Sequence, residues 1–293
     1  MNRIIKQLIP FDYIVLSHLL ILVVLQILWG YIHNTISHFL YINIILIGMI
    51  FVFIKSYNKW HKNPVIIFFR FFYPPLYVTF LYKNMNDLVH FFHYNSFDYL
   101  IDKIDRFFFL GYAPVLLLQK LVSPILTEIM HFGYMSYYFY MPVVAFSLFF
   151  FRKEEFPRYI FSIMCMYAVS FLMFAILPVQ SPRFFYPEIF LPPQNGYWIK
   201  HLNDIIMDNQ ALCGGSLPSS HVGLAVISSI FYFRYNKTYG SISVFFTLLL
   251  CISTIYGRYH YFSDVLLGII IGILFAYLSI RYHPEKSYRI NYA

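Results

Sequence analysis

Long apolar stretches separated by short polar ones dominate the chain. A helix needs roughly 20 mostly apolar residues to cross the hydrocarbon core of a bilayer, and eight stretches come close to that length. They cover residues 11–32, 38–56, 64–82, 123–150, 157–177, 218–235, 240–257 and 260–281. The pair Pro74-Pro75 interrupts the third stretch, so the pattern predicts about six to eight spans. We therefore expect an all-α, polytopic transmembrane helix bundle.

Two segments between the spans are more polar. Residues 84–120 contain Asp98, Asp102 and Asp105, and their pattern predicts one or two helices at the membrane interface with these aspartates on a solvated face. Residues 178–216 form the longest polar loop and are rich in proline and glycine. Long loops in compact proteins are usually functional, so this loop is a candidate part of a site.

Composition supports a membrane protein. Of the 293 residues, 60% are hydrophobic and 12% are charged, which leaves too few polar groups to coat a soluble globule. The net charge of +8 is also typical of nucleic-acid-binding proteins. Here the basic residues lie in short loops between apolar spans, so we expect the bilayer, and no nucleic acid, as partner. The three cysteines show neither a paired framework nor a metal-ligand spacing.

The distribution of lysine and arginine predicts the topology. If the N-terminus is cytoplasmic and the first span is uncleaved, most of the 21 basic residues fall on the cytoplasmic side. Both termini are then cytoplasmic. Arg183, His221, Arg258 and His260 all lie at the outer face, whether periplasmic, extracytoplasmic or lumenal.

Three polar segments lie at span ends on this shared face. They are Pro178–Arg183, Gly214–His221 and Arg258–Asp264. In the second segment we expect Ser216 to cap a helix that begins near Pro218. The third segment also begins a helix, and free amides at two helix ends would favour binding of a phosphate.

The residues of these segments suit phosphoryl transfer. Residues four apart share a helix face, so Asp264 can reach the ring of His260 and fix its tautomer. His260 can then attack phosphorus, and His221 can protonate the departing oxygen and later activate water or an alcohol. The expected phosphate-binding groups are two arginines and two hydroxyls: Arg183, Arg258, Ser219 and Ser220. The arginines neutralise charge and would repel a cation, so we expect no metal and no cofactor.

The three segments resemble the signature motifs of the type 2 phosphatidic acid phosphatase superfamily. Its Pro-Ser-Gly-His motif is similar to Pro218-Ser219-Ser220-His221, and its His-x-x-x-Asp motif matches His260 and Asp264. This sequence also departs from the usual pattern. Ile176 replaces the first-motif lysine, Phe184 follows Arg183 in place of proline, and Thr254 replaces the third-motif arginine, with Arg258 two residues before the histidine.

These departures resemble one branch of the superfamily, the inositol-phosphorylceramide synthase-like (inositolphosphotransferase-like) proteins. That branch has a Pro-x-x-x-Pro-Arg motif, an Arg-Tyr-His-Tyr-x-x-Asp motif and an upstream element similar to Asp105 through Gly111 and Pro114. The resemblance covers roughly residues 98–282. It implies a six-helix catalytic core there, preceded by N-terminal transmembrane helices in 1–97 and followed by a short cytoplasmic tail, 283–293.

The resemblance implies a lipid phosphate phosphatase or phosphotransferase that works through a phosphohistidine. The substrate is then a lipid phosphate or a phospholipid, and a transferase would add a lipid alcohol such as a ceramide as acceptor. The alternative from another class is a membrane transporter or channel that uses the same polar cluster, although such sites usually lie near the midplane. Several residues receive packing roles instead: Arg70, expected to snorkel, Thr254, and the group Tyr134, Tyr137, Tyr138 and Tyr140.

Overall fold

The chain begins with three long helices that pack beside one another. The computed structural model describes residues 7–89, 91–189, 193–210 and 212–282. The first helices are α2 (Pro10–His33), α3 (His38–Lys59) and α4 (Pro64–Asn84), and a short turn of helix, η1 (Met85–Asp87), follows. Helix α4 continues through Pro74 and Pro75. Helices α2 and α4 pack against α8, which attaches this group to the rest of the bundle.

The remaining long helices form a second group around α11. They are α7 (Pro124–Phe151), α8 (Glu155–Ile176), α11 (Ser220–Tyr235), α12 (Lys237–Tyr256) and α13 (Phe262–Tyr282). Helix α11 contacts α7, α8, α12 and α13 and therefore lies inside the bundle. A side chain at Gly268 would meet the carbonyl oxygen of Ser219 at 2.5 Å, and one at Gly272 would meet that of Gly223 at 2.6 Å. Glycine thus allows α11 and α13 to touch along their backbones.

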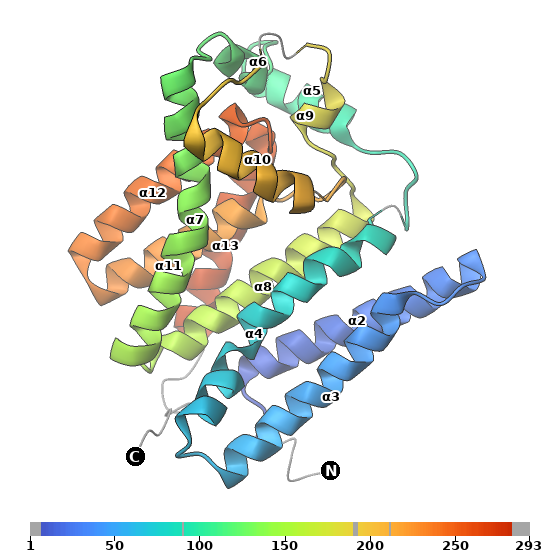
Figure 1. The fold of residues 1–293 in the computed structure, drawn as a ribbon, viewed down its shortest axis with the longest axis vertical. Coiled ribbons are helices and arrows are strands. Elements are labelled where there is room, and N and C mark those ends of the chain that lie inside the picture. Colours follow the sequence, from blue (N-terminus) through green and yellow to red (C-terminus); the bar gives the residue numbers. More distant parts are fainter. Residues whose placement is uncertain (1–6, 90, 190–192, 211, 283–293) are drawn as a thin grey trace.

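Short helices cover one end of this group. Helices α5 (Asp98–Phe108), α6 (Pro114–Gln119), α9 (Pro182–Phe185) and α10 (Trp198–Gln210) lie at the upper end in Figure 1. Helix α5 contacts α13, and α10 contacts α7. Helix α2 begins, and helix α13 ends, near the opposite end of the molecule (Figure 1). Among the described residues, the only β feature is an isolated parallel bridge between Val179 and Gly215.

The expected fold class is confirmed. In the described part of the chain, seven helices are long and apolar enough to cross a membrane, so the chain is an integral multi-pass membrane protein. They correspond to seven of the eight apolar stretches: α2, α3, α4 over Pro64–Tyr82, α7, α8, α12 and α13. The eighth stretch, 218–235, is α11, which begins at Ser220 and has 16 residues. Because its neighbours shield it from lipid, α11 can be shorter and carry more small and polar side chains.

Two expectations about polar residues are wrong. Asp98, Asp102 and Asp105 do not form a solvated face, because their exposed fractions are 0%, 7% and 1%. Arg70 does not snorkel, because it is 2% exposed and forms an ion pair with Asp12 at 2.6 Å. In both cases the charged groups turn into the bundle, where other parts of the chain supply their hydrogen bonds.

Candidate active site

The chain reverses direction sharply before His260. Helix α12 ends at Tyr256, and Arg258 has a φ of 66°, in the left-handed region that non-glycine residues rarely adopt. The backbone amides of Tyr259 and His260 both donate to the carbonyl oxygen of Thr254, at 2.9 and 3.2 Å. Helix α13 then begins at Phe262. This turn fixes His260 just outside the helix whose first turn contains Asp264.

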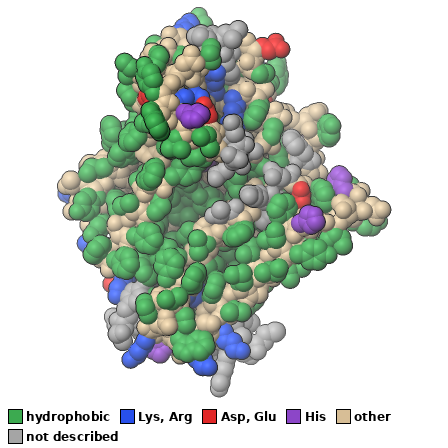
Figure 2. Space-filling view, viewed as in Figure 1, with side chains coloured by type: hydrophobic (Ala, Val, Ile, Leu, Met, Phe, Trp, Pro, Cys, Tyr) green, Lys and Arg blue, Asp and Glu red, His purple; other side chains and the backbone are tan. Residues whose placement is uncertain are grey.

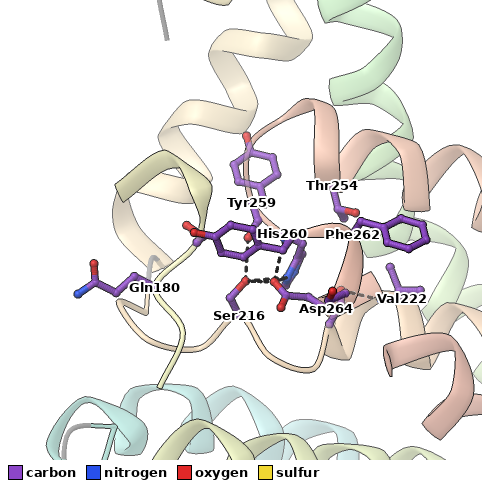
Figure 3. A network of polar contacts seen from close by, with 12 residues as sticks. Gln180, Ser216, Val222, Thr254, Tyr259, His260, Phe262 and Asp264 are labelled. Atoms are coloured by element: carbon purple, nitrogen blue, oxygen red, sulfur yellow. Dashed lines mark hydrogen bonds and ion pairs between the residues drawn. The ribbon is translucent and has the colours of Figure 1, made fainter. Parts of the chain in front are cut away.

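Ser216 lies between the carboxylate of Asp264 and the ring of His260 (Figure 3). Its hydroxyl donates to Oδ2 of Asp264 at 2.5 Å and lies 3.1 Å from Nδ1 of His260. The direct distance from Nδ1 to Oδ2 is 3.5 Å. The expected pairing of His260 with Asp264 is therefore present, with Ser216 as a bridge.

Ser216 consequently does not cap a helix, and that expectation is wrong. The N-cap of α11 is Ser219, whose side chain accepts from the amide of Val222 at 3.5 Å. Pro218 precedes the cap, and its peptide bond with Leu217 is cis. The helix starts two residues later than the proline position suggests, which leaves Ser216 on a loop that faces α13.

Backbone hydrogen bonds join the three polar segments. The amide of Val179 donates to Gly214 at 3.2 Å, and the amide of Ser216 donates back to Val179 at 3.0 Å. The amide of Arg183 donates to the carbonyl of Arg258 at 3.1 Å. The amide of Ser219 donates to the carbonyl of Asp264 at 3.0 Å. The convergence expected from the sequence is thus built from main-chain contacts.

A pocket opens between these segments and α7. Its lining includes His221, His260 and Arg183. The other lining residues come from α4, α7, the 178–216 loop, α10 and the turn before α13: Tyr82, Tyr134, Gln180, Ser181, Met207, Leu212, Gly215, Ser216 and Tyr259. The rings of His221 and His260 lie 6.1 Å apart between centroids. Tyr134, expected only to pack, also lies in this lining, 5.6 Å from the ring of His221.

Several polar atoms that line the pocket are buried without a protein partner. They are Nε of Arg183, Nδ1 of His221 and Oγ of Ser181, each without a hydrogen bond among the described residues. Ser181 also has a φ of 127°, an unfavourable backbone conformation for a residue with a side chain. Buried polar groups normally have partners, so this combination indicates a site for a polar ligand.

Three of the expected phosphate-binding side chains lie outside the pocket lining. Ser219 is occupied as a helix cap, and Ser220 is buried in the first turn of α11. The guanidinium of Arg258 donates to the side-chain oxygen of Gln119 on α6. Burial lowers the pKa of Arg258 to about 10, which still leaves it charged at neutral pH.

Asp98 makes contacts that its sequence pattern did not predict. Its carboxylate accepts from the amides of Gln180 and Ser181, at 2.8 and 3.1 Å, and from the hydroxyl of Tyr261 at 2.9 Å. Asp98 therefore ties the first polar segment to the residue that follows His260. The acidic character of α5 was visible in the sequence, but the partners of its carboxylates were not.

Asp105 occupies the beginning of α13. It accepts from the amides of Phe262 and Ser263, at 2.8 and 2.9 Å, and from the hydroxyl of Ser263. Burial raises the pKa of Asp105, and the bonds from Ser263 and Phe262 oppose that shift. These amides are satisfied by a carboxylate of the protein, so the expectation that they bind a phosphate is wrong for α13.

Within the described part of the chain, no group of three His, Cys, Asp or Glu side chains is arranged to hold a metal ion. The chemistry available from this geometry is that of two histidines, a carboxylate and an arginine around a polar pocket. Such groups can stabilise a phosphoryl group and move protons to and from its oxygens.

Comparisons with known proteins agree with this chemistry. A PA-phosphatase related-family protein from Dictyostelium discoideum is 24% identical over 177 residues, which cover 53% of this chain and 32% of the relative. The chain thus spans about a third of the length of that curated relative. No solved structure matches. The model of the PAP2 superfamily matches residues 100–278, more than half of the chain, and the protein therefore belongs to the PAP2 superfamily.

Proposed function

We propose that the protein is a lipid phosphate phosphatase or phosphotransferase that works through a phosphohistidine on His260. The observation that carries this proposal is the geometry around His260. Ser216 and Asp264 lie on the Nδ1 side of the His260 ring. The ring shares a pocket with His221 and with Arg183, whose Nε has no hydrogen-bond partner among the described residues. Membership of the PAP2 superfamily supports phosphatase chemistry in general.

In the first proposed step, Nε2 of His260 attacks the phosphorus of the substrate. A P–N bond forms as the P–O bond to the leaving group breaks, and His221 gives a proton to the departing oxygen. Asp264, through Ser216, stabilises the positive imidazole ring. Arg183 neutralises the phosphoryl oxygens.

In the second proposed step, His221 takes a proton from water or from an alcohol. The activated oxygen attacks phosphorus, the P–N bond breaks and His260 is regenerated. Arg258 is the proposed second arginine of the phosphate clamp, because its carbonyl is bonded to the amide of Arg183. Ser219 and Ser220 are assigned a supporting role, since they form the start of the helix that holds His221.

Headgroup transfer is the preferred form of this reaction, with a phospholipid donor and a lipid alcohol acceptor, as in an inositol-phosphosphingolipid synthase. Support comes from the motif departures at Ile176 and Phe184, which resemble those of the inositolphosphotransferase-like branch.

We further propose that the site lies at the outer face and that both termini are cytoplasmic. The excess of basic residues on alternate loops supports this orientation. So does the arrangement of the helices, because α2 begins and α13 ends away from the short helices around the site (Figure 1).

The first prediction tests the nucleophile. His260→Ala should lower turnover by at least about 10³-fold, because no other group can form the covalent intermediate. Phosphate release from lipid phosphates and diphosphates, and headgroup transfer from a phospholipid to a lipid alcohol, are both measured on purified protein. His61→Ala, at an exposed position far along the sequence, is the matched control. A fully active His260→Ala variant would refute the proposed mechanism.

The same assay separates the two reactions. Phosphate release without an acceptor identifies a phosphatase. A product that appears only when a phospholipid donor and an alcohol acceptor are both present identifies a transferase.

A further inference from the structure

Helix α10 carries an exposed apolar stripe. Trp198, Leu202 and Ile205 are 87%, 49% and 50% exposed. Their spacing of four and three residues places them on one face of the helix. The opposite face contacts the site, because Asn203 donates to the hydroxyl of Tyr259 at 2.5 Å and Met207 lines the pocket.

The start of α10 is fastened to the first turns of α7. The carboxylate of Glu128 accepts from the amides of Tyr197, Ile199 and Lys200 at 2.5, 2.9 and 3.1 Å. Helix α7 has 28 residues, so at 1.5 Å per residue it is about 42 Å long, against a hydrocarbon core of about 30 Å. Helix α7 is therefore longer than the hydrocarbon is thick, and Glu128 lies in the first turns of the helix, close to one of its two ends.

A second anchor gives the beginning of α10 the same depth in the membrane. The side chain of Gln194 donates to the carbonyl oxygen of Tyr256 at 2.5 Å, and Tyr256 is the last residue of α12. Helix α12 has 20 residues, which is about 30 Å and just spans the hydrocarbon. Both anchors thus place the beginning of α10 at the boundary between acyl chains and headgroups.

A wide apolar surface separates the charged ends of the molecule. In Figure 2, lysine and arginine side chains gather toward the upper and lower ends of the molecule, and the surface between them is mainly hydrophobic. Lys200 and Asp204, an ion pair at 2.5 Å, lie on α10 beside the apolar stripe rather than within it. An amphipathic helix with tryptophan on its apolar face is typical of helices that lie in the interface.

We propose that α10 is an interfacial membrane helix whose stripe of Trp198, Leu202 and Ile205 contacts the upper acyl chains of the bilayer. Its other face forms a wall of the pocket, so the pocket is separated from the lipid by the thickness of one helix. The partner of this surface is a lipid bilayer. The inference stands on the anchors and the exposed stripe, and it holds whichever reaction the site performs.

The fluorescence of Trp198 tests this placement. Trp198 is the only tryptophan left in the variant Trp29→Phe/Trp60→Phe, because the chain has three. The purified protein is reconstituted in phosphatidylcholine vesicles, with or without lipids brominated near the top of the acyl chain. Quenching of the fluorescence by these lipids is compared with quenching by iodide in the aqueous phase. We expect brominated lipids to remove about half of the fluorescence and iodide to remove much less, as for an interfacial tryptophan.

The reverse pattern would overturn the proposal: strong quenching by iodide with none by brominated lipid. A variant that keeps only Trp29, within α2, is the control that brominated lipids reach the protein. A spin label on Leu202→Cys in a Cys213→Ser background gives a second measurement without tryptophan changes. Its collisions with oxygen should exceed those with an aqueous nickel complex, and the opposite ratio would also overturn the proposal.

Discussion

Ser216 determines how the carboxylate of Asp264 acts on His260. Because the direct distance from Nδ1 to Oδ2 is 3.5 Å, a strong hydrogen bond between ring and carboxylate is absent in this arrangement. The hydroxyl donates to Asp264, so it can accept only from a protonated Nδ1. This direction leaves the lone pair on Nε2, which is the atom required for attack on phosphorus.

We therefore predict that Ser216→Ala lowers kcat by about 10- to 100-fold with little change in KM, since one orienting hydrogen bond is worth about 1–3 kcal/mol when its partner is buried. Ser216→Thr should retain more activity because it keeps the hydroxyl. The assay is turnover of the substrate identified above, with Ser241→Ala, an exposed serine on α12, as control. Equal activity in Ser216→Ala and the wild type would show that the bridge has no role in catalysis.

At this scale the sequence predicted the pairing of His260 with Asp264 but not the other contacts of these side chains. Motif spacing singled out four residues: His221, His260, Asp264 and Arg183. Of these, His221, His260 and Arg183 line one pocket. The bridge by Ser216 was not predictable, because a shift of two residues in the start of α11 decides whether this hydroxyl caps the helix or faces α13. The contact of Arg258 with Gln119 depends on the last residue of α6, 139 positions earlier in the chain, and has no local signal.

Helix α5 shows the same limit for a whole element. Its charged and apolar residues predicted an amphipathic helix, and the helix is present. The pattern does not say which face meets water. Asp98 and Asp105 are seven residues apart, two turns on one face, and that face meets polar backbone from two other segments. In a membrane protein, amides at loop and helix ends need internal partners, and buried carboxylates supply them.

We predict that Asp98→Asn lowers both activity and stability. One carboxylate oxygen becomes an NH₂ group that faces backbone donors, so at least one of the bonds from Gln180, Ser181 or Tyr261 is lost. The cost is about 1–3 kcal/mol of unfolding free energy for a buried group, with a loss of about tenfold or more in kcat. Thermal unfolding in detergent and turnover are measured beside Glu154→Gln, an exposed carboxylate before α8. Unchanged turnover in Asp98→Asn would contradict the positioning role.

For the whole molecule, hydropathy predicted the bundle, and charge distribution predicted its orientation. The bundle is confirmed, whereas the orientation and the division of the chain near residue 98 stay predictions. Cys213 offers a direct test because it is exposed and follows Leu212 in the pocket wall, while Cys165 is buried and Cys251 is partly so.

A membrane-impermeant maleimide added to intact cells should label Cys213 from the outside. Partial desolvation by neighbouring groups raises the pKa of this thiol, so labelling should be faster at mildly alkaline pH, where more thiolate is present. Cys213→Ser removes the signal if the assignment is right. Labelling only after permeabilisation would place the site on the cytoplasmic side.

Two of the three N-terminal helices, α2 and α4, are joined by a polar network that no hydropathy pattern reveals. Arg70 donates to both oxygens of Asp12 at 2.8 and 2.6 Å, and the hydroxyl of Tyr73 donates to the same carboxylate at 2.6 Å. Arg70 and Asp12 are 2% and 0% exposed, so water cannot solvate either charge. The pair lies outside residues 100–278, the part that matches the superfamily, and it fastens α2 to α4.

Removal of one charge of this pair should therefore destabilise the protein more than removal of both. Arg70→Met should lower the free energy of unfolding by about 3–5 kcal/mol because it leaves a buried, uncompensated carboxylate. Asp12→Asn added to Arg70→Met should recover part of this loss, since the remaining groups are neutral. Denaturation in mixed detergent is compared for the wild type, both single variants and the double variant, and turnover is measured for each. Equal destabilisation by the single and double variants would show that the charges do not act as a pair. Recovery of both stability and activity in the double variant would show that this network supports the bundle without taking part in the chemistry.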